Sequence, residues 1–326
     1  MRAIQVKQHG GPEVLTPVEL AVPEPGPDEV RLQLRAIGVN YVDVYHRIGR
    51  YPGHPPFIPG TEGAGVVDAV GANVVGVERG SPMVYVRGPG SYAEYACVPA
   101  AQLIPIPPGV AIDVAAAVML QGLTAHYLCY DVFPVKSGDP VLIHAAAGGT
   151  GLLLTQMCAA LGAQVIGTVS TDAKAALASQ AGAHDVIRYD RESVADEVKR
   201  LTQKQRGGPG VAVVFDGVGL ATFESSLACL RPRGLLALFG AASGPVPAFD
   251  PQALASKGSL FLTRPSLTNY VADREELLAR SGAVLGQVAS GQLRVRSEHR
   301  LPLAKAEQAH RDLESRSTTG KILLLP

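Results

Sequence analysis

The sequence predicts an α/β protein built from a β-rich half and a doubly wound parallel sheet. Up to about residue 118, short runs of alternating or apolar residues lie between Gly and Pro, which is typical of strands and turns. Beyond that point, short apolar strands alternate with helical stretches, which indicates parallel strands covered on both faces. The 326 residues exceed the common size of one domain, so we expect two.

The predicted elements follow one another along the chain. Strands of the first half are expected at 1–6, 29–39, 63–71 and 82–86. A helix at 118–133 opens an alternation of strands (140–144, 164–170, 184–189, 211–219) with helices (151–162, 173–182, 193–205), which the stretches 221–234, 235–244 and 259–267 continue. Two amphipathic helices, 273–291 and 305–316, precede a last apolar strand at 321–326.

These elements predict the domain boundaries. A β-rich domain is expected at 1–119 and the parallel-sheet domain at 120–266. The remaining residues, 267–326, are too few for a domain of their own. We therefore expect them to return to the first half, which makes the parallel-sheet domain an insertion.

Composition and charge exclude several partners. Lys plus Arg and Asp plus Glu each total 29, and no long basic block is present, so we expect no nucleic-acid partner. No run of about 18 apolar residues and no signal peptide is found, which predicts a cytoplasmic protein without a membrane anchor. Cys97, Cys129, Cys158 and Cys229 form no C-x-x-C pair, so we expect reduced thiols rather than a disulfide or metal site.

The stretch HAAAGGTGLL (144–153) joins a predicted strand to a predicted helix and carries a glycine motif. Ala146, Gly148 and Gly151 reproduce the G-x-G-x-x-G spacing, with alanine in the first place. In that motif the first residue permits the turn, the second lets the backbone approach a pyrophosphate, and the third lets helix and strand pack closely. Backbone N–H groups at the helix N-terminus then face the anion. The stretch therefore predicts a dinucleotide site rather than a merely structural turn.

The end of the following strand indicates which dinucleotide is bound. A carboxylate about twenty residues after the motif would hold the ribose 2′-OH of NAD, but this strand ends in Ser170 and Thr171. Asp172 lies past the strand end and is followed by Lys174. Because Ser170 and Lys174 offer a donor and a positive charge to a 2′-phosphate, we expect NADPH, with NAD as the alternative that Asp172 leaves open.

Two stretches of the first half, 36–49 and 57–67, resemble the catalytic half of the medium-chain dehydrogenases/reductases. The alcohol-oxidising members have G-V-C-H-T-D and G-H-E there, whereas this chain has Asn40 and Thr61 at the two zinc-ligand positions. The four-cysteine cluster of the structural zinc lobe is also missing, so we expect no metal. Without a Lewis acid for an alkoxide, reduction of a quinone or another conjugated carbonyl is favoured over alcohol oxidation.

Candidate catalytic residues lie near the missing zinc site. They are Asn40, Tyr45 and Tyr51, with Tyr41 next to them. If this segment is helical, Asn40 and Tyr45 lie about one turn apart and can face one pocket. We hypothesise that they contact the nicotinamide end and help to form the acceptor site, although a packed tyrosine ring with a satisfied hydroxyl is the alternative for each tyrosine.

The resemblance extends over the whole chain. The stretches HGGPEVL, AIGVN, GTEGAGVV, GLTAHYL, HAAAGGTGLL, DGVG, FGAASG and GSLFLTRPSL are similar to the zinc-independent, NADPH-dependent quinone oxidoreductases, the zeta-crystallin-like branch of the medium-chain superfamily. This resemblance implies a GroES-like β-rich catalytic domain, a Rossmann NADPH-binding domain, and a homodimer paired through GSLFLTR. It also implies NADPH contacts from Tyr41, Val42, Asp43, Val44, Tyr45, Tyr127, Gly149, Thr150, Ser170, Thr171, Lys174, Tyr189, Phe239, Gly240, Ala241, Ala242, Leu262, Thr263, Arg264 and Arg316.

Two other functions compete with quinone reduction. An enone or enoyl-thioester reductase would use the same hydride delivery to a conjugated carbonyl. A non-catalytic NADPH-binding protein, for example one that binds RNA, belongs to a different class. The neutral charge and the lack of interleaved Arg and aromatic residues argue against RNA.

Overall fold

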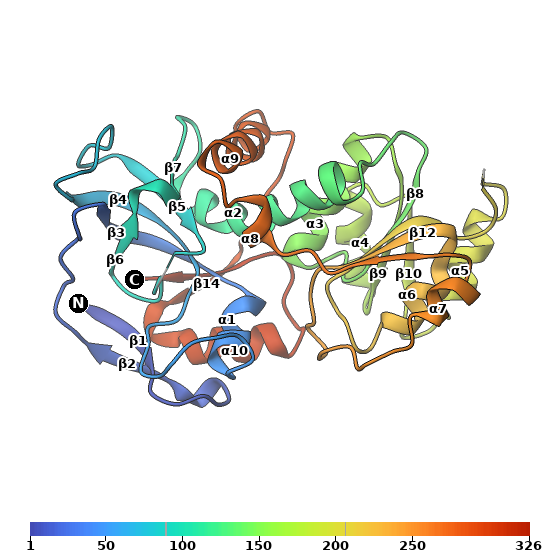
Figure 1. Cartoon of the computed structure of the whole chain (residues 1–326), viewed down its shortest axis with the longest axis horizontal. Coiled ribbons are helices and arrows are strands. Elements are labelled where there is room, and N and C mark those ends of the chain that lie inside the picture. Colours follow the sequence, from blue (N-terminus) through green and yellow to red (C-terminus); the bar gives the residue numbers. More distant parts are fainter. Residues whose placement is uncertain (89, 206) are drawn as a thin grey trace. The chain divides into compact units, whose positions relative to one another are not determined.

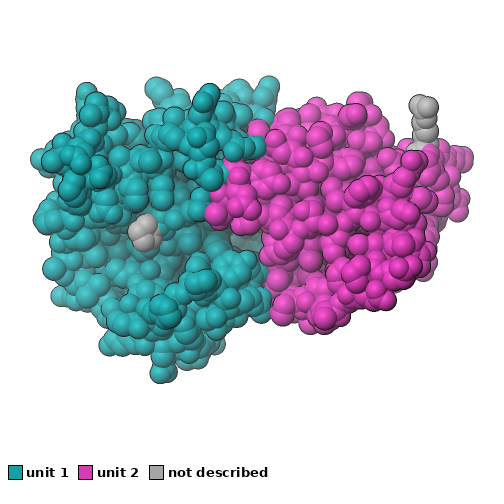
Figure 2. Space-filling model, in the orientation of Figure 1, with its two compact units in different colours: residues 1–123, 271–326 teal, residues 124–270 magenta. Residues whose placement is uncertain are grey.

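The computed structural model describes residues 1–88, 90–205 and 207–326 and divides into two compact units. The first unit contains Met1–Leu123 and Val271–Pro326, and the second contains Thr124–Tyr270. Figure 1 shows the elements of each unit, and Figure 2 colours the two units separately. The boundaries fall at 123 and 270, where the sequence placed them at 119 and 266.

The first unit is built on a mixed sheet with the strand order β14-β15-β3-β4-β5-β7, in which β6 also pairs with β3 and every pair is antiparallel except β14 with β15. Its strands are β3 (Glu29–Val39), β4 (Glu62–Val70), β5 (Pro82–Val86), β6 (Tyr95–Pro99), β7 (Leu103–Pro105), β14 (His299–Pro302) and β15 (Ile322–Leu325), and β1 (Arg2–Val6) pairs with β2 (Leu15–Glu19) in a separate hairpin. In β3, Val30, Leu32 and Leu34 are buried while the residues between them are not, which is the alternation expected of a sheet with one covered face.

The C-terminal segment belongs to the first unit. Strand β15 pairs antiparallel with β3 through Ile322↔Val39, and the apolar side chains of α10 and β15 join the same core. The helices of this unit are α1 (Tyr41–Arg47), α9 (Arg274–Ala289), α10 (Ala306–Glu314) and the first part of α2 (Ile112–Tyr127).

Helix α2 corrects one sequence prediction. Residues 112–117, expected among strands and turns, are helical, because the alanine-rich run there favours a helix over a strand. The helix continues into a π-helical turn at Leu128–Val132. By length and composition, Ile112–Val132 could cross a membrane, but 67% of its apolar window is buried in the protein, which is the environment of a core helix.

The second unit is a six-stranded parallel sheet with the order β10-β9-β8-β11-β12-β13. Its strands are β8 (Pro140–Ile143), β9 (Gln164–Val169), β10 (Asp185–Arg188), β11 (Val211–Asp216), β12 (Leu230–Leu238) and β13 (Phe261–Thr263). In chain order this is the 3-2-1-4-5-6 arrangement of the Rossmann fold. Every residue of the central strand β11 is buried, as a strand covered on both faces requires.

Helices cover both faces of this sheet. They are α3 (Gly149–Ala160), α4 (Asp172–Gln180), α5 (Val194–Thr202) and α6 (Phe223–Cys229), and the unit also contains the short helices α7 (Gln252–Ser256) and α8 (Leu267–Tyr270). Helix α3 contacts α4, and α5 contacts α6, so each pair shares one face of the sheet, as Figure 1 shows. Strands β9 and β10 are added on one side of β8, and β11, β12 and β13 are added on its other side. The strand order therefore reverses between β8 and β11, and the carboxyl ends of these two strands flank that point.

Candidate functional site

The glycine loop joins β8 to α3, and Gly149 and Thr150 begin the helix. The sequence predicts the tight turn at Ala146. In the structure the turn is at Ala145, which takes the left-handed conformation with φ of 51°. A Cβ on Gly151 would lie 2.3 Å from the carbonyl oxygen of Ala145, so glycine is needed for the helix to approach the strand this closely. A Cβ on Gly148 would meet one neighbour within 4 Å among the described residues, the carbonyl oxygen of Ala145 at a tight 3.2 Å, so its other sides are open to a pyrophosphate.

Ser170, Thr171 and Lys174 gather at the carboxyl end of β9. Thr171 caps α4, its Oγ1 accepting the backbone N–H of Lys174 at 3.2 Å. The Nζ of Lys174 lies 3.5 Å from Oγ of Ser170. The ammonium and the hydroxyl predicted to hold a 2′-phosphate are therefore neighbours.

Asp172, the residue that left NAD open, is paired with arginines. Its Oδ1 accepts a hydrogen bond from Nη1 of Arg188, and its Oδ2 lies 3.7 Å from Nη2 of Arg191. Arg188 also binds Asp190 through two hydrogen bonds of 2.8 Å. Because two guanidinium groups face the Asp172 carboxylate, its repulsion of a 2′-phosphate is offset, which favours NADPH.

The loops that follow β11 and β12 are joined by backbone hydrogen bonds. The N–H of Phe239 donates to the carbonyl of Asp216 at 2.8 Å, and the N–H of Ala242 donates to the carbonyl of Gly217 at 3.2 Å. The strand predicted to extend to residue 219 ends at Asp216, because its carboxylate accepts the N–H groups of Val218 and Gly219 and turns the chain. The predicted loop 239–242 is thus fixed to this turn.

The remaining predicted residues of the second unit lie at the same edge of the sheet. Tyr189 follows β10 and is 48% exposed. Leu262 and Thr263 belong to β13, and Arg264 follows them. The structure thus places the predicted cofactor residues from Ala146 to Arg264 at or next to the carboxyl ends of successive parallel strands, which is where ligands of doubly wound sheets bind.

Tyr127 is the first predicted cofactor residue of the second unit along the chain. It is buried, and its ring stacks on that of Tyr270 with centroids 4.3 Å apart and an interplanar angle of 5°. One face of the Tyr127 ring is therefore covered by Tyr270, and the predicted contact with NADPH stays a prediction.

In the first unit, the two zinc-ligand positions border buried carboxylates. The Nζ of Lys321 lies 2.5 Å from Oε2 of Glu62 and 2.6 Å from Oδ1 of Asn40. Nδ2 of Asn40 donates to Oε2 of Glu62 at 2.8 Å and to the carbonyl of Gly38 at 3.2 Å. Because the amide of Asn40 is engaged at both its nitrogen and its oxygen, a direct contact with nicotinamide would require one of these bonds to open.

Asp43 is fully buried beside this cluster. Its carboxylate accepts the N–H of Asn40 at 2.8 Å, the hydroxyl of Thr61 at 3.1 Å and the hydroxyl of Tyr92 at 3.3 Å. Burial raises the pKa of Asp43 to about 7, although the Asn40 N–H, the Lys321 ammonium and the Thr61 hydroxyl oppose the shift. The Asp43 carboxylate and the equally buried Val44 do not present exposed side chains to a cofactor.

Three tyrosines of the first unit form an aromatic cluster with two arginines. Helix α1 brings Tyr41 and Tyr45 together, with ring centroids 6.3 Å apart, and Tyr51 packs edge-on against Tyr45 at 5.2 Å. The guanidinium of Arg50 lies 5.0 Å from the Tyr45 ring centroid. Burial raises the pKa of Tyr41, and the neighbouring Arg316 guanidinium opposes the shift. The segment is helical, as the pairing of Asn40 with Tyr45 required, with Asn40 as its N-cap. Tyr41, Tyr45, Tyr51 and Arg316 lie in one region of the unit, while Val42 is half-buried.

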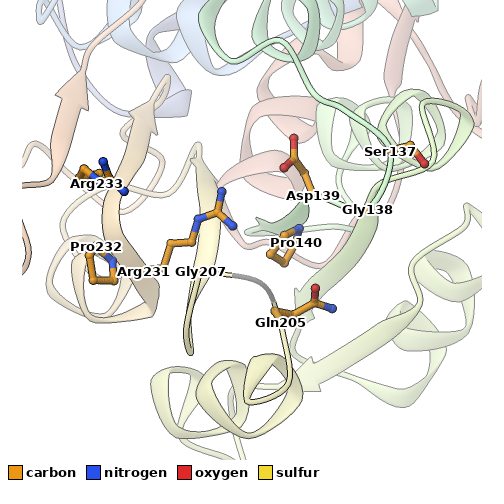
Figure 3. Close-up of a pocket in the computed structure, with 9 residues that line it drawn as sticks. All are labelled: Ser137, Gly138, Asp139, Pro140, Gln205, Gly207, Arg231, Pro232 and Arg233. Carbon is orange, nitrogen blue, oxygen red and sulfur yellow. The ribbon is translucent and has the colours of Figure 1, made fainter.

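A cavity of about 650 Å³ lies at the opposite, amino-terminal edge of the second unit's sheet. Figure 3 shows its lining residues, which are Ser137, Gly138, Asp139, Pro140, Gln205, Gly207, Arg231, Pro232 and Arg233. Pro140 begins β8, and Arg231 lies near the start of β12. Because the glycine loop follows the other end of β8, this cavity is not the predicted NADPH site.

Sequence reasoning missed Glu62, Lys321 and Asp216. The signals were present but weak: Lys321 is a lone charge before the apolar run ILLL, and Asp216 ends a fully apolar strand. Within residues 1–88, 90–205 and 207–326, no group of three or more His, Cys, Asp and Glu side chains is arranged to hold a metal ion.

Comparison with known proteins identifies relatives for both units. Residues 26–108 match the family described as alcohol dehydrogenase GroES-like domain, and residues 149–279 match the family described as zinc-binding dehydrogenase. The chain is 45% identical over 329 residues to a quinone oxidoreductase of Pseudomonas aeruginosa, covering 100% of this chain and 99% of the relative. It is 41% identical to a 2-haloacrylate reductase of a Burkholderia species, covering 99% and 98%. The crystal structure of Escherichia coli quinone oxidoreductase complexed with NADPH matches with a TM-score of 0.96 and 41% identity over 100% of both chains.

Proposed function

The chain belongs to the quinone oxidoreductase family of the medium-chain dehydrogenases/reductases, and we propose that it reduces a quinone with NADPH held along the carboxyl edge of the second unit's sheet. The observation that carries this placement is the glycine loop, where Gly151 permits close packing and Gly148 leaves the backbone accessible. Bound NADPH supplies a hydride to the acceptor. The residues of this chain bind and orient that cofactor and meet the charge that develops on the acceptor.

Cofactor selection rests on the end of β9. Ser170 and Lys174 offer the 2′-phosphate a hydroxyl and an ammonium, while Asp172 is paired with Arg188 and Arg191. A charge-assisted hydrogen bond contributes about 1.5–3 kcal/mol, or roughly 10- to 150-fold in affinity. This contribution is available to NADPH and absent with NADH.

The acceptor needs hydrogen-bond donors and a proton once it has received a hydride. We assign these roles to Tyr45 and Tyr51, whose rings pack against each other at 5.2 Å. Asn40 acts as a positioning residue, because its amide bridges Lys321 and Glu62. Asn40 and Thr61 are poor zinc ligands, so the oxyanion is stabilised by hydrogen bonds in this proposal.

The first test is a steady-state assay of NADPH oxidation with 1,4-benzoquinone, 9,10-phenanthrenequinone and crotonyl-CoA, repeated with NADH and with a chelator. We expect quinone-dependent turnover that prefers NADPH and does not change with the chelator. Lys174→Met should weaken NADPH binding by about 10-fold or more and leave NADH binding unchanged. The matched variant Asp172→Asn should not lower NADPH affinity. Equal loss of NADPH and NADH affinity in Lys174→Met would refute the assignment of the 2′-phosphate site.

A second acceptor class is favoured by one relative. The chain is 41% identical to a 2-haloacrylate reductase over nearly its full length, and an acrylate is a conjugated carboxylic acid. The same hydride delivery to a β-carbon would serve such an acceptor. Turnover on 2-chloroacrylate or crotonyl-CoA that exceeds turnover on every quinone would reverse the ranking.

We also propose that the protein forms a homodimer through β13 and that it is cytoplasmic. β13 is the last strand in the order of the second unit's sheet, and Phe261 on it is 61% exposed, so the edge offers unpaired backbone groups and an apolar side chain. In sedimentation experiments Phe261→Lys should shift the dimer toward monomer, whereas Val75→Lys, at a 92% exposed site of the first unit, should not.

The four free cysteines fit a reducing compartment, and the neutral charge gives no reason to expect nucleic acid or membrane partners.

A further inference from the structure

A buried chain of polar side chains lies directly beneath the glycine loop. His144, the first residue after β8, places Nδ1 2.9 Å from Oγ1 of Thr168 in β9 and Nε2 3.0 Å from Oγ of Ser226 in α6. Ser226 donates in turn to Oδ2 of Asp216 at 2.8 Å. None of the four residues is more than 4% exposed. His144, Thr168 and Ser226 are not among the residues proposed to contact NADPH or the acceptor.

The hydrogen positions along this chain follow from the acceptor at its end. The Asp216 carboxylate accepts from Ser226, from the hydroxyl of Thr222 at 2.7 Å, and from two backbone N–H groups. Since the Ser226 proton points to Asp216, its oxygen must accept from Nε2–H of His144. Nδ1 of the neutral imidazole then accepts the Thr168 hydroxyl. Burial lowers the pKa of His144, which agrees with a neutral ring.

The hydrogen-bonded side chains of Thr168, His144, Ser226 and Asp216 join the three strand ends on which the proposed NADPH site depends. β8 leads into the glycine loop, β9 leads to Ser170 only two residues after Thr168, and β11 ends at Asp216. The carbonyl of Asp216 holds the loop 239–242 through Phe239. The order β9-β8-β11 makes these strands neighbours on both sides of the reversal point.

We propose that His144 is a positioning residue for NADPH, locked in its Nε2–H tautomer, that sets the relative placement of the glycine loop, the end of β9 and the Asp216 turn; this inference rests on the proposed NADPH site. The imidazole is buried and all of its partners are internal, so it takes no proton from the acceptor. It acts by fixing loop geometry, on which binding depends to within a fraction of an ångström.

The proposal is tested by NADPH binding, followed through the fluorescence of NADPH itself, since the chain contains no tryptophan. Thr168→Val and His144→Gln each remove one hydrogen bond of the chain and should raise the NADPH dissociation constant by about 3- to 10-fold. At saturating NADPH, kcat should change less than the dissociation constant. The matched control is Thr155→Val, because Thr155 is buried in α3 and its hydroxyl has no hydrogen-bond partner among the described residues.

A spectroscopic readout separates this role from a general loss of stability. In the unmodified protein, the ¹⁵N resonances of His144, assigned through the His144→Gln variant, should show Nε2 protonated and Nδ1 unprotonated between pH 6 and 8. In Ser226→Ala the Nε2–H loses its acceptor, and we expect NADPH affinity to fall as in Thr168→Val.

Three results would overturn the proposal. One is a protonated Nδ1, and another is NADPH affinity in Thr168→Val and His144→Gln equal to that of Thr155→Val. The third is a rise in the dissociation constant that is explained by partial unfolding in the thermal melt. If Lys174→Met leaves NADPH affinity unchanged, the proposed NADPH site itself fails. If Lys174→Met weakens binding and the His144 chain variants do not, only the positioning role fails.

Discussion

Replacing Lys321 with methionine tests whether its buried ammonium stabilises the first unit. Lys321 is 1% exposed and Glu62 is fully buried, with 2.5 Å between Nζ and Oε2. Methionine keeps most of the aliphatic chain and removes the charge. Among the described residues, the donors that remain to Glu62 are neutral: Nδ2 of Asn40 at 2.8 Å and the N–H of Leu120 at 2.5 Å. The variant therefore leaves a buried carboxylate without a cation.

The size of the effect follows from that arrangement. Removing one partner of a buried ion pair costs about 3–5 kcal/mol, because the remaining charge stays desolvated. For a domain of roughly 150–250 residues, each kcal/mol lowers the melting temperature by about 2–4 °C, so we expect a fall of about 6–20 °C. The double variant Glu62→Gln/Lys321→Met contains neither charge, and we expect it to be at least about 1 kcal/mol more stable than Lys321→Met alone.

Calorimetry and urea unfolding followed by circular dichroism provide the measurements. The exposed Lys305→Met serves as the control, and its free energy of unfolding should stay within about 0.5 kcal/mol of the unmodified protein. The reasoning is refuted if Lys321→Met lies within about 1 kcal/mol of the unmodified protein. It is equally refuted if the losses of the two single variants simply add in the double variant, since coupled charges do not add.

Two further predictions concern the glycine loop and Asp43. In Gly151→Ala the new Cβ would lie 2.3 Å from the Ala145 carbonyl oxygen, so we expect a loss of about 1–3 kcal/mol of unfolding free energy. In Gly148→Ala the Cβ would lie 3.2 Å from the same oxygen, so the melting temperature should fall less than in Gly151→Ala, while NADPH affinity falls in a calorimetric titration. Because the pKa of Asp43 rises from 3.8 to about 7 on folding, its contribution to stability is complete below about pH 4 and is lost as the pH rises through 7. Relative to the unmodified protein, Asp43→Asn should therefore gain up to about 4 kcal/mol between pH 4 and pH 7.5 in urea unfolding, and a pH-independent difference would contradict this.

The fold was largely predictable because its signals are local. The continuous apolar run at 211–216 indicated a central parallel strand, and the glycine spacing at 146–151 indicated a strand–loop–helix unit. Strands that carry no such pattern were missed: β2, β6 and β14 contain proline, and β7 has only three residues. Helix α2 was predicted to begin too late because its alanine-rich first turns have no clear amphipathic period.

The candidate site was predictable only where function depends on neighbours in sequence. Ser170 and Lys174 are four residues apart, and their pairing at a helix start could be read from the chain. The Lys321–Glu62 pair spans 259 residues and the His144–Ser226 contact spans 82, so no pattern of spacing connects them. Burial alone would not have found them either, since a lone lysine before an apolar strand is more often a solvated charge.

Asn40 shows why a residue type at a suggestive position does not by itself define a role. An amide offers two N–H donors and one carbonyl oxygen, and Asn40 directs its nitrogen to Gly38 and Glu62 and its oxygen to Lys321. The zinc-ligand position is thus occupied by a group that links a buried carboxylate to a buried ammonium. If Asn40 acts in the reaction, it acts through Lys321 and Glu62, so Asn40→Ala should lower the free energy of unfolding together with turnover. Tyr45→Phe keeps the packed ring and removes the hydroxyl, so it should lower turnover more than it lowers the free energy of unfolding. A fall in turnover without a fall in stability for Asn40→Ala would instead restore the direct contact predicted from the sequence.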